Sequence, residues 1–205
     1  MLKGIFIELC RRYTNQLSLT EDLWNEIEIS YNHQQRFYHN LDHLQHLINS
    51  LKDVRDQIKN WDALLFSVFY HDVVYNPIKN NNEEQSALLA VKRLKEMGVD
   101  DEIMNECREQ ILATKSHLLS FNADVNIFTD ADLAILGSDW ETYCSYTGKI
   151  RQEYKVYPDI IYKPGRRKVL QHFLSMEKIY KTDHFFEKLE KRAKENLKKE
   201  LALLS

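Results

Sequence analysis

Apolar residues along this chain recur mostly with the three- to four-residue spacing of an amphipathic helix. Residues 39–59 carry such a stripe, which predicts one helix packed along a single face. Residues 63–74 are apolar on nearly every side, which predicts a buried central helix. The pattern predicts further helices over 83–97, where Gly98 is a natural C-terminal cap, and over 100–115.

The remaining segments are also expected to be mainly helical. Ser18 and Glu21 have the spacing of a capping box, which predicts a helix that continues to about Tyr31. Residues 118–128 are less periodic and are expected to form a loop with a short extended piece. The last three helices are expected over residues 132–157, with a break near Gly137 or Gly148, 166–180 and 184–204.

Chain-breaking residues are scarce. The 205 residues include 5 Gly and 3 Pro, too few for the frequent turns of a sandwich, barrel or propeller. Pro158 and the pair Pro164-Gly165 are expected to separate helices. The sequence therefore predicts an all-α protein with one domain over residues 1–205, built from roughly eight to ten helices of typical length.

Charge and cysteine content narrow the possible partners. The 28 Lys+Arg and 31 Asp+Glu give a net charge of -3, so neither nucleic acid nor an anionic membrane is an expected partner. Cys10, Cys107 and Cys144 are far apart and odd in number, which is typical of reduced thiols, and no signal peptide is apparent. We therefore expect a cytoplasmic protein. The apolar stripe of the final helix either packs within the chain or forms the seam of a homodimer.

Some of the 8 histidines are arranged rather than scattered. His39 and His43 are four residues apart, so on a helix they would share one face, as ligands or as a stacked polar pair. His71 and Asp72 end the apolar helix, where a divalent ion would offset the cost of a carboxylate beside buried apolar residues. The remaining histidines except His117 are expected to have no functional role: His33, His46, His172 and His184.

The order of these pieces resembles the HD superfamily of metal-dependent phosphohydrolases. The sequence motifs that carry the resemblance are Tyr38-His39-Asn40-x-x-His43, His71-Asp72-Val73, Asn82-Glu83 with Ser86-Ala87, Ala113-Thr114, His117 and Ala131-Asp132-Leu133. The first is similar to the signature of cyclic-nucleotide phosphodiesterases. With Ile150-Arg151-x-Glu153-Tyr154 and Gly165-Arg166, nearly the whole chain resembles small bacterial proteins described as predicted metal-dependent HD phosphohydrolases.

The resemblance implies a helical bundle of the HD or phosphodiesterase type and assigns roles to residues. His39 would be a general acid, and Asp72 would take part in catalysis as well as in metal binding. Asp130 is a rival for the last ligand position, or simply the N-cap of a helix that starts near Ala131. The implied metal ligands are His43, His71, Asp72 and Asp132.

Other residues are assigned supporting roles. Glu83, Glu84 and His117 would support the ligands or hold a second ion. The phosphate of the substrate would be held by Arg151, Arg166 or Arg167, which are equally consistent with surface ion pairs. The cofactor is a divalent ion, and zinc, manganese, magnesium, iron, nickel and cobalt are not distinguished. The chain is shorter than the phosphodiesterases and lacks a counterpart of their purine-binding glutamine region, which disfavours a cyclic nucleotide.

The implied activity is hydrolysis of a phosphate ester of a nucleotide or another small metabolite. Two alternatives stay open on the sequence. One is a non-catalytic module in which the metal joins the helices and a ligand binds beside it. The other is a di-iron oxygenase of the HD type, for which His117, Glu83 and Glu84 would complete the second iron site.

Overall fold

The computed structural model describes residues 1–204, and within this range the regular elements are ten α-helices and two short 3-10 helices, with no strand. The predicted all-α class is therefore confirmed. The helices divide into two compact units, Met1–Thr129 and the part of the chain that starts at Asp130. No helix in the described range combines the length and apolar character that a membrane span requires.

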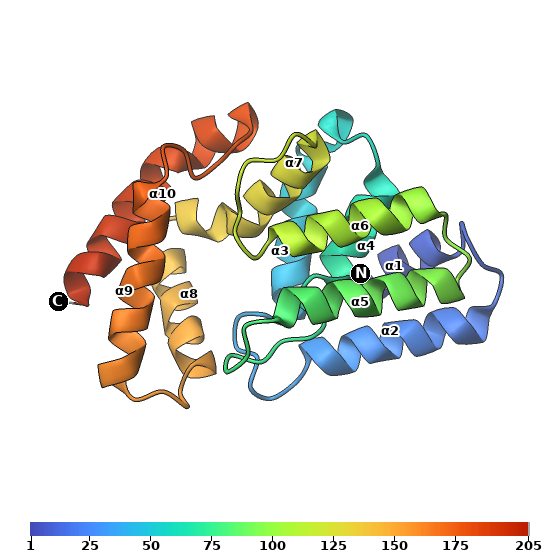
Figure 1. Cartoon of the computed structure of the whole chain (residues 1–205), viewed down its shortest axis with the longest axis horizontal. Helices are drawn as coiled ribbons and strands as arrows, with labels where there is room; N and C mark the ends of the chain where they lie inside the picture. Colours follow the sequence, from blue (N-terminus) through green and yellow to red (C-terminus); the bar gives the residue numbers. More distant parts are fainter. Residues whose placement is uncertain (205) are drawn as a thin grey trace. The chain divides into compact units, whose positions relative to one another are not determined.

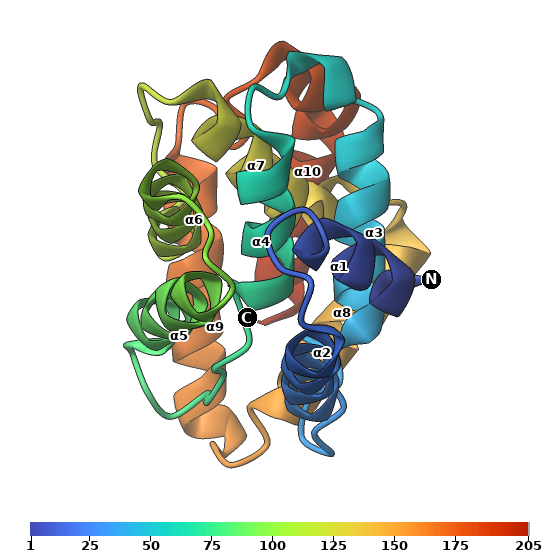
Figure 2. The same cartoon turned by 90° about the vertical axis from the view of Figure 1, so that its right-hand side faces the viewer.

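The first unit is built around helix α4 (Trp61–Tyr70), whose side chains from Ala63 to Tyr70 are all buried. Figure 2 shows α5 and α6 on one side of α4 and α1, α2 and α3 on the other. The other elements of this unit are α1 (Leu2–Cys10), α2 (Leu17–Tyr31), α3 (Leu41–Lys52), η1 (Arg55–Gln57), α5 (Asn82–Glu96), α6 (Asp101–Ala113) and most of α7 (Ala123–Asp132).

Aromatic side chains fill the space between α1, α2 and α4. The ring of Phe6 lies 5.0 Å from that of Phe69 and 6.0 Å from that of Trp24, in tilted and edge-on arrangements. Tyr70 is fully buried and lies 6.3 Å from Phe6. Offset and edge-on aromatic pairs add about 0.5–1.5 kcal/mol each beyond the area that they bury. This cluster therefore holds α4 rigidly up to the residue before His71.

The second unit contains η2 (Leu133–Gly137), α8 (Trp140–Glu153), α9 (Asp159–Ser175) and α10 (Asp183–Leu203). Figure 1 shows α8 and α9 running antiparallel after a short connection, and α10 packs against α9 and η2. The side chains of α10 that are buried form one face: Phe185, Glu190, Ala193, Asn196, Leu197 and Glu200. Part of the final stripe thus packs within this unit, on a face that also buries polar residues.

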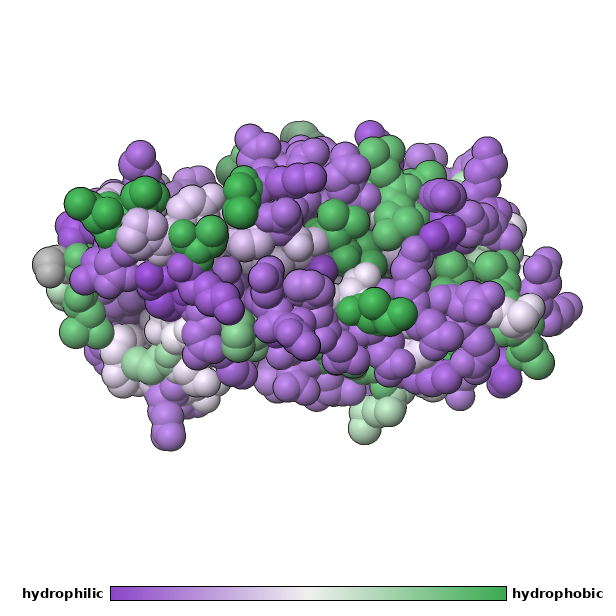
Figure 3. Space-filling view, turned by 90° about the horizontal axis from the view of Figure 1, so that it is seen from below, coloured by the Kyte–Doolittle hydropathy of each residue, from purple (hydrophilic) through white to green (hydrophobic). Residues whose placement is uncertain are grey.

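Several predicted helices match the structure, and their ends are explained by local chemistry. Helix α5 ends at Glu96 with Met97 as the C-cap, and Gly98 follows with φ 74°, as predicted for a helix that stops at a glycine. The break expected near Gly137 is present, since η2 separates α7 from α8. The face shown in Figure 3 is mainly hydrophilic with separate apolar patches, as expected for helices that bury one stripe.

Other predictions of local structure are wrong. The capping box does not form, because α2 already begins at Leu17 and its N-cap Gln16 makes no side-chain cap hydrogen bond. Residues 118–128 are not a loop throughout, because α7 begins at Ala123. Asp130 is not an N-cap, since it lies in the last turn of α7. Pro164 and Gly165 do not separate helices but lie within α9.

Candidate metal centre

His43 is positioned by the start of helix α3. Asn40 is the N-cap, and its side-chain oxygen accepts hydrogen bonds from the backbone amides of Asp42 and His43 at 3.0 and 3.3 Å. His39 therefore precedes the helix, so the expected shared helical face is not what brings the two histidines together. Their ring centroids nevertheless lie 5.9 Å apart in an edge-on arrangement. The cap fixes His43 on the first turn of α3, where its side chain is buried.

His71 directly follows α4 as its C-cap, and its ring has a defined orientation. Its Nδ1 lies 2.9 Å from the carbonyl oxygen of Val68, and a carbonyl can only accept. In the neutral ring Nδ1 therefore carries the proton, which leaves the lone pair on Nε2. That Nε2 faces the Nε2 of His43 at 3.1 Å, and the two residues are 1% and 5% exposed. A backbone carbonyl that fixes the tautomer in this way is the usual support of a metal-binding histidine.

Helix α7 brings a carboxylate to the two histidines. Asp124 anchors this helix to the start of α4, because its two oxygens accept the backbone amides of Lys59 and Asn60 at 3.0 and 2.8 Å. One turn later, the ring of Phe128 packs edge-on against His71 at 5.7 Å. Asp132 follows Phe128 by four residues on the same helix and so shares its face. The place of Asp132 is thus set by a helix whose body belongs to the first unit.

These three side chains form a group that can hold a metal ion. One ligand atom from each of His43, His71 and Asp132 lies within 4.8 Å of the other two. An ion with metal–nitrogen bonds of about 2.0–2.1 Å and coordination angles of about 90–109° places two nitrogens about 2.8–3.4 Å apart. The observed Nε2–Nε2 distance of 3.1 Å falls within this range. Two imidazoles and a carboxylate suit zinc, iron, manganese, nickel or cobalt better than calcium.

Asp72 and His39 lie beside this group. The Oδ2 of Asp72 is 3.2 Å from the Nε2 of His71 and 4.0 Å from the Nε2 of His39. Both side chains keep partial access to solvent, at 17% for Asp72 and 20% for His39. A carboxylate and an imidazole that lie next to the buried histidines and keep partial contact with solvent can exchange protons with a bound molecule. Their roles as ligand and general acid stay predictions.

The two aspartates of the Asp130-Ala131-Asp132 motif have different surroundings. Asp130 is fully buried and accepts the backbone amides of Lys181 and Thr182 and the hydroxyl of Thr182, all at 2.8 to 3.0 Å. The ammonium group of Lys181 lies 3.2 Å from Asp130 Oδ1. Burial is the main factor in the pKa of Lys181, which it lowers despite this carboxylate. Asp130 thus anchors the segment before α10, and of the two aspartates it is Asp132 that forms a group with the histidines.

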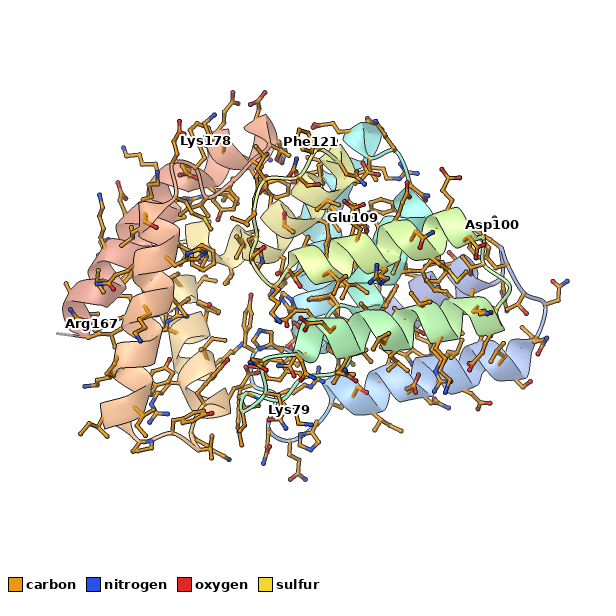
Figure 4. All side chains as sticks on the ribbon, in the orientation of Figure 1. Lys79, Asp100, Glu109, Phe121, Arg167 and Lys178 are labelled. Carbon is orange, nitrogen blue, oxygen red and sulfur yellow. The ribbon has the colours of Figure 1, made fainter. Side chains whose placement is uncertain are left out.

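The residues expected to support the ligands lie at the ends of α5 and α6. Glu83 and Glu84 are in the first turn of α5. Glu84 pairs with Lys115, which lowers the pKa of this carboxyl, and Lys115 also donates to the carbonyl of Asn80. His117 follows α6 with φ 52°, an uncommon conformation for a residue other than glycine. Figure 4 shows the loop marked by Lys79, which joins the His71-Asp72 segment to α5.

The arginines expected to bind phosphate have partners within the second unit. Arg151 donates to Asp159 at 2.7 and 3.0 Å and to the carbonyls of Tyr154 and Tyr157, so it closes the turn between α8 and α9. Arg166 is buried and donates to both oxygens of Glu200, at 2.7 and 2.9 Å. These contacts are sufficient to explain why both arginines are held in place.

The sequence does not single out Arg36, Tyr31 or Tyr75. Arg36 and Tyr31 contact the backbone of Asp72, and Tyr75 packs against Arg36 and His39. The available signal was the position of Arg36, three residues before His39. Comparison of the chain with protein-family models, curated protein sequences and solved structures yields no match. The function must therefore be argued from the site itself.

Proposed function

We propose that this protein is a metal-dependent phosphohydrolase of the HD type, acting on a small phosphate ester. The observation that supports it is that His43, His71 and Asp132 bring their ligand atoms close enough together to bind one ion. His43 and His71 would each supply Nε2, and Asp132 and Asp72 would supply carboxylate oxygens. A divalent ion held there supplies Lewis-acid activation of water and polarises a phosphoryl oxygen.

The residues of the chain supply the rest of the chemistry. The carbonyl of Val68 keeps the proton of the neutral His71 ring on Nδ1, so the lone pair of Nε2 is available to bind a metal ion. His39 is held outside the ligand group, with its Nε2 4.0 Å from Asp72, and protonates the leaving oxygen. This placement favours a hydrolase over a purely structural metal site, because a structural site has no use for an exposed acid next to its ligands.

The test measures metal content and turnover together. Protein prepared with each divalent ion in turn is assayed for bound metal and for hydrolysis of a panel of phosphomonoesters, nucleotides and cyclic nucleotides. His71→Ala and Asp132→Asn should lose the metal and the activity. His46→Ala is the matched control, since His46 lies on the same helix α3 but is exposed, and it should retain both.

The outcomes separate the alternatives. Equal turnover by wild type and His71→Ala would show that the active site lies elsewhere. A bound ion that raises thermal stability, with no turnover of any ester, would identify the non-catalytic metal-joined module instead. Oxygen consumption by an iron-loaded protein would identify the oxygenase.

A further inference from the structure

Arg36 joins the two chain segments that carry His39 and Asp72. Its Nη1 donates to the carbonyl of Asp72 at 2.6 Å, and its Nη2 donates to the carbonyl of Val73 at 2.9 Å. Nη1 also lies 3.4 Å from the carbonyl of His39, within the same segment as Arg36 itself. One planar guanidinium group thus contacts both the residue before the α3 cap and the residues after the end of α4.

The carbonyls that Arg36 meets follow directly on the end of α4, where backbone acceptors have no partner within the helix. The backbone of Asp72 is held from its other side too, because its amide donates to the hydroxyl of Tyr31 at 3.2 Å. The guanidinium carbon of Arg36 lies 4.9 Å from the centre of the Tyr31 ring. Arg36 and Tyr31 together therefore fix the backbone from which the Asp72 side chain projects.

The same arginine is linked to the ring of His39 through Tyr75. The guanidinium carbon lies 5.4 Å from the centre of the Tyr75 ring. That ring packs against His39 with a centroid distance of 4.4 Å and an angle of 31° between the planes. Cation, phenol and imidazole thus form one stack, in which displacement of Arg36 would release Tyr75 and with it one wall of the His39 ring.

We propose that Arg36 is a positioning residue that sets the separation between the His39 imidazole and the Asp72 carboxylate at this site. The inference rests on the proposed function for its meaning in catalysis, but its geometry does not depend on turnover. A lysine would keep the positive charge but not the fork, because an ammonium group is a point donor and a guanidinium group is a planar pair of donors. The charge alone is therefore insufficient.

The experiment compares Arg36→Ala and Arg36→Lys with Arg93→Ala. Arg93 is the matched control because it also lies in the first unit and its guanidinium group also donates several hydrogen bonds. Its partners are Glu26 on α2 and Glu96 on α5. Each protein is measured for kcat and KM on the best ester, for the dissociation constant and absorption spectrum of bound Co²⁺, and for its melting temperature.

Arg36→Ala should lower kcat or weaken Co²⁺ binding by about 10–100-fold, the usual effect of removing a group that orients a metal site. Millimolar guanidinium should restore part of the loss in Arg36→Ala and have no effect on Arg93→Ala, a rescue that a merely structural role would not show. Arg36→Lys covers the case in which the alanine variant fails to fold, and it should show the same direction of change with a melting temperature close to wild type. Values of kcat and Co²⁺ affinity within threefold of wild type in both variants would overturn the inference.

Failure of the proposed function would be recognised separately. If the wild-type protein hydrolyses no ester, the Co²⁺ spectrum still reports whether Arg36 orients the ligands. If it binds no metal at all, the ¹H–¹³C resonances of the His39 imidazole in Arg36→Lys decide, because the Tyr75 ring shields them in the stack. Resonances unchanged from wild type, like those expected in Arg93→Ala, would refute the positioning role.

Discussion

The buried pair of Arg166 and Glu200 allows a sharp distinction between a structural and a substrate-binding arginine. Their side chains are 8% and 10% exposed, and two hydrogen bonds of 2.7 and 2.9 Å join them. Tyr143 also donates to Glu200. Arg166→Met would keep most of the apolar stem but leave the carboxylate buried, with the Tyr143 hydroxyl as its one remaining side-chain donor among residues 1–204.

Removing one partner of a buried ion pair costs about 3–5 kcal/mol in the free energy of unfolding. For a chain of this length each kcal/mol corresponds to about 2–4 °C, so the melting temperature should fall by about 6–20 °C. The double variant Arg166→Met/Glu200→Leu should recover most of that loss, because neither charge is then buried alone. Circular dichroism during heating and urea unfolding measure both quantities.

Arg167→Met is the control, since Arg167 is the next residue along α9 and is only half-buried, and it should change stability by less than about 0.5 kcal/mol. A free energy of unfolding of Arg166→Met within about 1 kcal/mol of the wild-type value would show that the pair does not stabilise the fold. An Arg166→Met protein of normal stability whose KM for a phosphate ester rises would instead support the substrate role that the sequence allows.

Two further predictions test the packing of each unit. In Gly137→Ala the new Cβ would lie 2.5 Å from the Cβ of Leu189, so we expect a loss of about 1–3 kcal/mol, whereas Gly148→Ala in α8 meets nothing within 4 Å and should gain about 0.5–1 kcal/mol in urea unfolding. Equal effects at the two glycines would contradict the packing of η2 on α10. Burial raises the pKa of Cys10 and that of Cys107 from 9.0 to about 12, so in the native protein exposed Cys144 alone should react with Ellman's reagent and release one equivalent of thionitrobenzoate. Because the unfolded chain loses these thiol protons first, the free energy of unfolding should fall as the pH rises above about 9, and a rise would show that the two thiols are not buried.

The sequence predicts the helices best where one face is apolar and the ends carry standard signals. Helix α5 is an example, because its buried residues recur with helical spacing and Gly98 provides the stop. The sequence does not predict helix α7, for the opposite reason. Val125, Ile127 and Phe128 are buried together with polar neighbours, so no apolar face alternates with a polar one.

Pro164 shows why a chain breaker is only a statistical signal. Proline removes one backbone donor and therefore one hydrogen bond to the residue four positions earlier, here Ile160. Both Pro164 and Ile160 are exposed, so water can satisfy the freed carbonyl of Ile160. The cost that normally ends a helix is reduced at this position, and α9 continues through it.

The site was easier to predict than the residues that support it. Histidine and aspartate are chemically distinctive, and the resemblance to the HD superfamily could therefore point to His43, His71 and Asp132, which the structure brings together. Arg36 acts mainly through backbone carbonyls, which every residue has, so nothing in the sequence marks its partners. Such contacts become visible only when the chain segments are placed in space.

The choice between Asp130 and Asp132 shows how helix geometry resolves what composition leaves open. Side chains two residues apart on an α-helix diverge by about 200° around its axis, so both carboxylates cannot face the same ion. Asp130 is engaged by Lys181 and Thr182, and this contact fixes the rotation of the last turn of α7 about its axis. That same rotation directs Asp132 along the face of Phe128, whose ring contacts His71. We therefore expect Asp130→Asn to weaken Co²⁺ binding even though the carboxylate of Asp132 is retained, while unchanged affinity would show that Asp132 is oriented independently.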